Sequence, residues 1–276
     1  MRCFEIRLKD YFPFLGEAGK DPVLTAYLPY NMKETHWEDI RRPSVLLCPG
    51  GGYGFVSQRE GEPVALKLLP EGYNVFILTY SVAPNKFPAQ LREVAAAMEL
   101  IHSNAAQWNC DPARVAIMGY SAGGHLAAHY STAYNCREVR EVFPESKPVQ
   151  GTILCYPVIS AKPEVCHAGS FENLTGHSYP LSEEELLKFS CEELVTENTP
   201  PAFLWHAFSD KLVPAMNSAL YAKALMEKKV PVGLHIFHVG RHGMATVDEQ
   251  TTTVEPAVQA VKAWLPLLLQ WLKDTL

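Results

Sequence analysis

The stretch Gly119-Tyr120-Ser121-Ala122-Gly123 decides the fold, because it places a serine between two glycines where the local pattern changes. The residues before it, Arg114–Gly119 (RVAIMG), predict a strand, and Ala122–Tyr134 predicts a helix. A G-x-S-x-G sequence between a strand and a helix is typical of a serine held on a sharp turn. The glycines omit Cβ atoms that would collide with neighbouring backbone, and the helix N-terminus directs free N–H groups at developing negative charge. We therefore predict Ser121 to be a nucleophile.

A serine hydroxyl is a poor nucleophile without an adjacent base. When the serine lies on a strand-to-helix turn of this kind, an acid and then a histidine follow it in the chain. Asp210 comes just after the predicted strand Ala202–Phe208, and His242 follows the predicted strand Leu234–Val239. Both residues fall at the carboxyl edge of the sheet, where open α/β sheets bind ligands. We predict His242 to be the base and Asp210 the residue that orients it.

Short apolar runs alternate with helical patterns through most of the chain. Further strands are predicted at Ser44–Cys48, Tyr73–Tyr80 and Val149–Tyr156, and further helices at Ala89–Trp108, Pro214–Lys228 and Pro256–Leu272. The alternation predicts an α/β fold with a mostly parallel sheet covered by helices on both faces. Strands near Cys3–Lys9 and Val23–Leu28 are expected to start the sheet in antiparallel fashion. We predict a single domain over residues 1–276.

One long segment, Ile159–Pro201, interrupts this rhythm. It contains a Gly/Ser/Asn-rich part and an acidic helical pattern at Ser182–Phe189. Long insertions in compact domains are often functional, so residues 159–201 are interpreted as a small lid. A surface excursion without contact to substrate is the alternative.

A glycine-rich loop, Pro49-Gly50-Gly51-Gly52-Tyr53, follows the strand at Ser44–Cys48. Backbone N–H groups of Gly51, Gly52 and Ala122 are the expected donors of an oxyanion hole. No phosphate-binding glycine pattern is present. A purely structural turn is the alternative, because turns also use glycine.

The remaining histidines are interpreted as structural. His235 and His238 lie on a predicted strand and His206 inside a buried-looking one, where we expect a core histidine. His125 and His129 have a spacing that could bind a metal ion, but no third ligand is evident. We expect neither a metal nor a cofactor.

Composition narrows the function class. The chain has 276 residues, 47% hydrophobic and 20% charged, and a formal net charge of −6. Without a basic cluster, an apolar run long enough to span a membrane or a signal-peptide pattern, we expect no nucleic-acid or membrane partner and a cytoplasmic location. Seven scattered cysteines without a CxxC pair fit a reducing compartment.

The apolar segment Ala257–Leu272 is expected to pack on the sheet, and part of it could form a homodimer contact.

Together these motifs resemble the α/β-hydrolase family, in particular its short acetyl-esterase branch, which is related to carbohydrate esterases and hormone-sensitive-lipase-like enzymes. The similar segments are CPGGGYGFVSQREGEPVALKL, GYSAGGHLAAH, PPAFLWHAFSDKLVP and HVGRHGM. The resemblance implies Ser121, Asp210 and His242 as the triad and Gly50–Tyr53 as the oxyanion loop. Pro49 stands where the lipase-like relatives have a histidine, which favours the acetyl-esterase branch.

The expected substrate is a small acyl ester, such as an acetylated oligosaccharide. Tyr53, Phe55 and Tyr120 are candidates for stacking on a sugar face, or else are packing residues. A general short-chain carboxylesterase or a formamidase-like amidase would use the same triad. A non-catalytic receptor-like module is the alternative of a different class.

Overall fold

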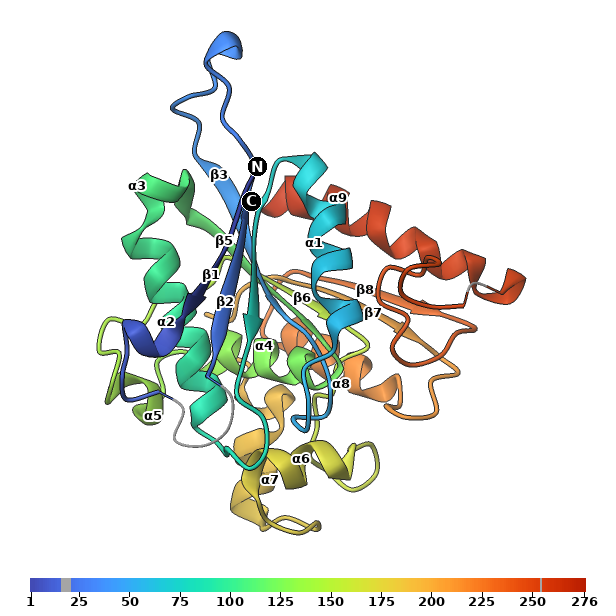
Figure 1. Cartoon of the computed structure of the whole chain (residues 1–276). Helices are drawn as coiled ribbons and strands as arrows, with labels where there is room; N and C mark the ends of the chain where they lie inside the picture. Colours follow the sequence, from blue (N-terminus) through green and yellow to red (C-terminus); the bar gives the residue numbers. More distant parts are fainter. Residues whose placement is uncertain (16–20, 254) are drawn as a thin grey trace.

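The computed structural model describes residues 1–15, 21–253 and 255–276, and in them one eight-stranded sheet forms the centre of the molecule (Figure 1). The strand order is β1-β2-β4-β3-β5-β6-β7-β8. The strands are β1 (Arg2–Arg7), β2 (Val23–Leu28), β3 (Arg42–Cys48), β4 (Asn74–Thr79), β5 (Cys110–Tyr120), β6 (Gly151–Cys155), β7 (Ala202–Ala207) and β8 (Val232–Phe237).

The sheet is parallel from β4 to β8, and only β1 and β2 run antiparallel to their neighbours. The predicted α/β class, the mostly parallel sheet and the antiparallel start are therefore confirmed. Strand β1 ends two residues earlier than expected, because Leu8–Asp10 turns into the 3-10 helix η1. Strand β5 begins four residues earlier than expected, since Cys110 already pairs with Arg42 across a register shift.

The other elements of the structure are α-helices and short 3-10 helices. The α-helices are α1 (Glu62–Leu68), α2 (Ala89–Ser103), α3 (Ala105–Trp108), α4 (Ser121–Ala133), α5 (Arg137–Arg140), α6 (Ala168–Thr175), α7 (Glu183–Phe189), α8 (Met216–Glu227) and α9 (Trp264–Thr275). The other 3-10 helices are η2 (Lys33–Thr35), η3 (Gln58–Glu60), η4 (Leu69–Glu71), η5 (Cys191–Leu194) and η6 (Pro256–Ala263). Two predicted helices are each divided: Ala89–Trp108 into α2 and α3, and Pro256–Leu272 into η6 and α9.

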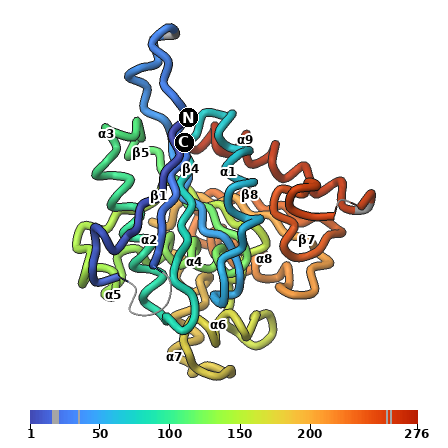
Figure 2. Tube along the Cα trace, viewed as in Figure 1, coloured from blue at the N-terminus to red at the C-terminus, as the bar shows by residue number. Residues whose placement is uncertain are grey.

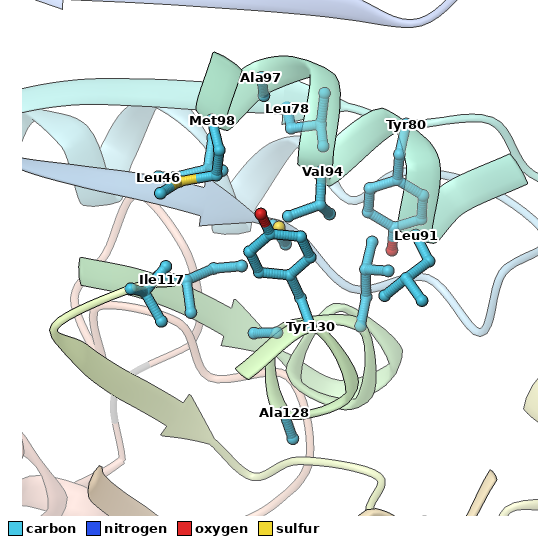
Figure 3. Packing of buried hydrophobic residues seen from close by; sticks show 14 of the residues in the cluster. Leu46, Leu78, Tyr80, Leu91, Val94, Ala97, Met98, Ile117, Ala128 and Tyr130 are labelled. Carbon is cyan, nitrogen blue, oxygen red and sulfur yellow. The ribbon is translucent and has the colours of Figure 1, made fainter. Parts of the chain in front are cut away.

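Both faces of the sheet are covered, which explains the uninterrupted apolar strands. Along β3, Leu46 and Cys48 point into one hydrophobic cluster while Val45 and Leu47 point into another. Helices α2, α4 and α8 close the first cluster, and α1, η6 and α9 close the second. Figure 3 shows the first cluster between α2, α4 and the strands.

The C-terminal segment packs on the sheet as predicted. Val261, Trp264, Leu268 and Leu272 are fully buried in the second cluster. No helix among the described residues is both long enough and apolar enough to cross a bilayer.

The insertion at residues 159–201 contributes α6, α7 and η5, and α6 and α7 lie together at one end of the molecule (Figure 2). The predicted acidic helix is present: Ser182 caps α7 in a reciprocal arrangement with Glu185. Asn217 of α8 fixes the start of the insertion by hydrogen bonds. Its side chain accepts from the N–H groups of Ile159 and Ser160 and donates to Val165 O. The insertion is therefore packed against the body of the fold.

Candidate active site

Ser121 sits on a strained turn at the junction of β5 and α4. Its φ is 53°, in the left-handed region that costs energy for a residue with a side chain. A Cβ added at Gly119 would lie 2.1 Å from Gly123 O, and one added at Gly123 would lie 2.2 Å from Cys48 O. Both glycines are therefore required sterically, for the reason that the sequence motif predicts.

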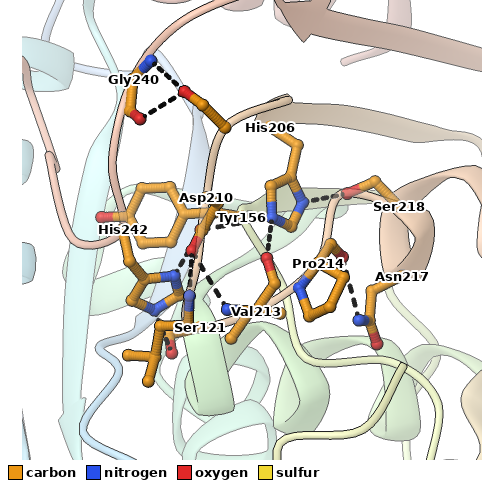
Figure 4. Close-up of polar contacts among 12 residues, drawn as sticks. Ser121, Tyr156, His206, Asp210, Val213, Pro214, Asn217, Ser218, Gly240 and His242 are labelled. Atoms are coloured by element: carbon orange, nitrogen blue, oxygen red, sulfur yellow. Dashed lines mark hydrogen bonds and ion pairs between the residues drawn. The ribbon is translucent and has the colours of Figure 1, made fainter. Parts of the chain in front are cut away.

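The structure brings Ser121, His242 and Asp210 together (Figure 4). His242 Nε2 lies 2.8 Å from Ser121 Oγ, and His242 Nδ1 lies 2.7 Å from Asp210 Oδ2. Because the carboxylate can only accept, Nδ1 carries the imidazole proton and Nε2 is left to accept from the serine hydroxyl. This is the geometry in which histidine acts as general base on serine.

Asp210 is almost completely buried and is surrounded by donors. Its Oδ1 accepts from the backbone N–H groups of Leu212 and Val213 at 2.9 and 3.1 Å, and its Oδ2 faces His242. Burial acts to raise the pKa of Asp210, but contacts with His206 and His242 outweigh it and hold that pKa well below its ordinary value. The carboxylate is therefore ionised at neutral pH.

His206 is a second histidine on this carboxylate. Its Nε2 lies 2.9 Å from Val213 O and 3.4 Å from Asp210 Oδ2. Both are acceptors, so Nε2 carries the proton, and Nδ1 accepts from Ser218 Oγ at 2.8 Å. The prediction of a buried core histidine is confirmed, since His206 is 0% exposed, but its contact with Asp210 was not predicted. A histidine four residues before the acid is the one signal in the sequence.

The glycine-rich loop lies next to the serine, since a Cβ added at Gly50 would lie 2.9 Å from Ser121 Cβ. Gly51 and Gly52 have φ values of 127° and 61°, and a Cβ at Gly51 would lie 2.0 Å from Phe55 O. Among the described residues, the N–H groups of Gly51 and Gly52 donate to no protein acceptor. The N–H of Ala122 lies in the first turn of α4, where helix N–H groups lack intrahelical partners. These groups are available to stabilise an oxyanion.

The loop is fixed from several sides without the histidine of lipase-like relatives. Tyr80 Oη donates to Pro49 O at 2.6 Å, and Asn173 of α6 donates to Gly52 O at 2.8 Å. The buried Glu60 accepts from the N–H of Gly50 at 2.8 Å. The insertion thus contacts the oxyanion loop directly, and its role as a lid over substrate stays a prediction.

Glu60 also connects the two sides of the site. Its second oxygen accepts from Tyr156 Oη at 2.7 Å, and the same hydroxyl accepts from the N–H of Ala245 at 2.9 Å. The Tyr156 ring packs edge-on against His242, with ring centroids 4.9 Å apart. One buried carboxylate therefore fixes both the oxyanion loop and the segment after His242. Sequence reasoning missed Glu60, although it lies in the similar segment CPGGGYGFVSQREGEPVALKL.

Two of the three predicted substrate-stacking residues are wrong. Tyr120 is 0% exposed and packs against Tyr156 and Trp264, on the sheet face opposite α4. Tyr53 is 1% exposed and its hydroxyl lies 2.8 Å from His125 Nδ1. Both aromatic faces are covered by protein, so neither can stack on a sugar.

Phe55 is different, because it is 61% exposed. It borders a groove of about 1210 Å³ beside the oxyanion loop, which is also lined by Leu66, Tyr80 and Gln250. The described lining residues of this groove include neither Ser121 nor His242. Stacking of Phe55 on a sugar face stays a prediction.

His125 connects Tyr53, at the end of the glycine-rich loop, to Phe189 of the insertion by two hydrogen bonds. Its Nε2 lies 2.8 Å from Phe189 O and therefore donates, so that Nδ1 accepts from Tyr53 Oη. Burial lowers the pKa of His125 to about 4, which keeps the ring neutral. Within the part of the chain that the structure describes, no group of three His, Cys, Asp or Glu residues could hold a metal ion.

Comparisons with known proteins agree with this architecture. The BD-FAE family model matches residues 27–225. Endo-1,4-beta-xylanase B of Butyrivibrio fibrisolvens is 37% identical over 252 residues, covering 88% of this chain and 38% of that protein. Acetylxylan esterase of Xylanibacter ruminicola is 32% identical over 203 residues, covering 72% of this chain and 40% of that protein. The chain thus spans about two fifths of the length of these curated relatives.

Solved structures resemble nearly the whole chain. An acetyl ester-xyloside bifunctional hydrolase from Caldicellulosiruptor lactoaceticus has a TM-score of 0.84 at 33% identity, covering 98% of this chain and 96% of that one. A carboxylesterase from Lactobacillus plantarum has a TM-score of 0.81 at 25% identity, covering 99% and 98%.

The fold and the site define an α/β hydrolase, as the sequence resemblance implied. The chain belongs to the BD-FAE family, and the proteins similar to it include acetyl esterases and other ester hydrolases.

Proposed function

We propose that this chain is a serine esterase that removes acetyl groups from small carbohydrate esters. The observation that carries the proposal is the pair of contacts from His242, 2.8 Å to Ser121 Oγ and 2.7 Å to Asp210 Oδ2, beside a loop whose Gly51 and Gly52 N–H groups have no acceptor among the described residues. A donor array facing a base-activated serine is the arrangement that acyl transfer needs.

In the proposed reaction, Ser121 Oγ attacks the ester carbonyl as His242 Nε2 takes its proton. The carbonyl oxygen becomes an oxyanion, which the N–H groups of Gly51, Gly52 and Ala122 stabilise. The imidazolium, stabilised by Asp210, then protonates the leaving alcohol, and an acetyl-enzyme remains. Water, deprotonated by His242, attacks the acetyl-enzyme. His242 then returns the proton to Ser121 Oγ as the bond between that oxygen and the acetyl carbon breaks and acetate leaves.

The carbohydrate part of the proposal is supported by similarity. Relatives are named for acetylxylan ester hydrolysis and for acetyl ester and xyloside hydrolysis. The carboxylesterase neighbour supports a second candidate, a short-chain carboxylesterase without sugar preference. An amidase of the formamidase type would use the same catalytic groups.

The test is hydrolysis of 4-nitrophenyl acetate and of acetylated xylo-oligosaccharide by wild type and Ser121→Ala. Cleavage of both esters, with at least about 10³-fold loss in the variant, is expected. Cleavage of the aryl ester alone would favour the second candidate. Near-normal turnover by Ser121→Ala would contradict the serine mechanism. Hydrolysis of 4-nitrophenyl butyrate tests whether a longer acyl group is accepted, and hydrolysis of an N-formyl substrate tests the amidase alternative.

The cytoplasmic location also remains a proposal. All seven cysteines are free thiols, and Cys48, Cys110, Cys155 and Cys191 are buried. Free thiols persist in reducing compartments. Fractionation of the native host, with a cytoplasmic and a secreted marker enzyme, would test it.

A further inference from the structure

His167, at the N-terminus of insertion helix α6, lies beside the oxyanion loop. A Cβ built on Gly52 would lie 3.9 Å from His167 Cε1 and 3.8 Å from Ser170 Oγ. The same helix is fixed to the loop by the 2.8 Å hydrogen bond from Asn173 Nδ2 to Gly52 O. The insertion therefore positions a half-buried histidine at the candidate oxyanion hole.

Among the described residues, Nδ1 of His167 makes a hydrogen bond and Nε2 makes none. Nδ1 lies 2.8 Å from Ser170 Oγ, and Ser170 is fully buried. This contact is the one hydrogen bond of that hydroxyl among the described residues, so donation from Oγ to Nδ1 leaves no buried proton unpaired. Nε2 then carries the ring proton and, within the described part of the chain, donates to no protein group.

The charge environment keeps this donor neutral. Burial and then the positive charge of a protonated His242 lower the pKa of His167, against a smaller opposite effect of Asp210. A neutral N–H donor suits a hydroxyl better than it suits a carboxylate or a phosphate.

Two residues before His167, Val165 O accepts from Asn217 of α8, and the adjacent Ser218 bonds His206 beside Asp210. His167 therefore lies between Gly52 of the oxyanion loop and the element that supports Asp210.

The chemistry of the site indicates which part of an ester His167 meets. The leaving oxygen receives its proton from His242, so the alcohol portion lies on the His242 side of the oxyanion hole. A donor that lies between Gly52 and the acid–base side of the site therefore faces the alcohol portion.

We propose that His167 Nε2–H donates a hydrogen bond to a hydroxyl of the alcohol portion, so that His167 selects acetate esters of polyols over esters of alcohols without further hydroxyls. This inference rests on the proposed esterase activity of the Ser121 site, but it does not require that the natural alcohol be a xylo-oligosaccharide.

The test compares wild type with His167→Ala on two pairs of esters. Glycerol monoacetate and acetylated xylo-oligosaccharide carry free hydroxyls, whereas ethyl acetate and 4-nitrophenyl acetate carry none. We expect kcat/KM to fall by about tenfold for the first pair and to stay within about twofold for the second. His167→Gln, which retains an N–H donor at a similar distance, should recover part of the loss.

His177→Ala is the matched control, because His177 lies in the same insertion and is exposed, bonded to Glu185. It should change none of the four rates. A parallel loss on all four esters in His167→Ala, or no loss on any, would overturn the proposal. If wild type cleaves the small esters but not the oligosaccharide, the carbohydrate assignment fails, while glycerol monoacetate against ethyl acetate still decides the role of His167. If wild type cleaves none of the four, both proposals are overturned.

Discussion

The two sides of Ser121 are built differently. On the acid–base side, Asp210 and His242 come from loops after β7 and β8, and His206 and two backbone N–H groups support the carboxylate. On the oxyanion side, Glu60, Tyr80 and Asn173 hold the backbone of the loop after β3. The first side positions side chains, and the second positions peptide groups.

Buried carboxylates behave in opposite ways on the two sides. Asp210 has its pKa held well below the ordinary value because donors outweigh its burial. Glu93 supports the oxyanion side, since it accepts from Ser81, which adjoins the loop-anchoring Tyr80. Burial raises the pKa of Glu93 to about 7, because Ser81 supplies too few donors to offset it. For these two carboxylates, the direction of the pKa shift follows from whether hydrogen bonds and nearby positive charge outweigh burial.

The largest effect is expected on the acid–base side, from Asp210→Asn. The amide can donate to Nδ1 and so stabilise the wrong tautomer of His242, and kcat should fall by about 10⁴-fold. Burst and steady-state kinetics on 4-nitrophenyl acetate measure this loss. Asp111→Asn, which breaks a surface ion pair with Arg114, is the control and should keep full activity. A loss below about tenfold in Asp210→Asn would show that Asp210 does not orient the base.

The second prediction concerns the pH dependence of stability. Between pH 4.5 and about 7, folded Glu93 holds a proton that the unfolded chain has released, so the free energy of unfolding falls as pH rises. The total fall is about 3 kcal/mol. Asp210 acts with the opposite sign, because its contribution is present above its ordinary pKa of 3.8 and is lost as pH falls below it.

Urea unfolding at pH 5, 6, 7 and 8 tests the contribution of Glu93. Glu93→Gln should flatten the slope over this window, and Glu99→Gln on the same helix α2 should leave it unchanged. If Glu93→Gln leaves the dependence of the unfolding free energy on pH unchanged, a group other than Glu93 causes that dependence.

The third prediction addresses the bridge between the two sides. In Glu60→Gln, the amide oxygen can still accept from the N–H of Gly50, but the NH₂ group then faces Tyr156 Oη, whose proton loses the carboxylate oxygen that accepts it. We expect kcat to fall by about 10- to 100-fold with little change in KM, since an oxyanion exists only after attack. Steady-state kinetics measure both constants, and the exposed Glu62→Gln is the control. A rise in KM alone would instead indicate a role in substrate binding.

The smallest effect is expected from Tyr53→Phe, which tests the corrected role of this residue. Loss of its hydroxyl leaves His125 Nδ1 unpaired, so the free energy of unfolding should fall by about 1 kcal/mol. The ratio of activities on acetylated sugar and aryl acetate should not change, because the ring is buried. Thermal unfolding and the two assays measure these quantities, with the exposed Tyr30→Phe as control. A selective loss on the sugar ester would instead show that the Tyr53 hydroxyl acts on the substrate.

Local patterns were sufficient for the fold and for the three central residues. The turn at Ser121 can be recognised from Gly119 and Gly123, because a Cβ atom added at either position would overlap backbone. The alternation of apolar strands and helices follows from burial on both faces of the sheet. Chain order and position after β7 and β8 were enough to choose Asp210 and His242, although His242 lies 121 residues from Ser121.

The supporting residues could be found only in three dimensions. Glu60 reaches Tyr156 across 96 residues, and Asn173 reaches Gly52 across 121. Neither pairing leaves a periodic signal, because a single hydrogen bond constrains one side chain and not a repeating face. The direction of Tyr53 and Tyr120 was equally undetermined, since an aromatic beside a glycine can face solvent or core.

By itself, then, the sequence determined the α/β architecture, the strained serine turn and the order of acid and histidine, because each is set by short-range sterics and periodicity. Tertiary structure alone decided in which direction the pKa of each buried carboxylate shifts, which residues hold the oxyanion loop and that His167 lies next to it. Those properties depend on burial and on donors contributed by distant segments, which exist only once the chain has folded.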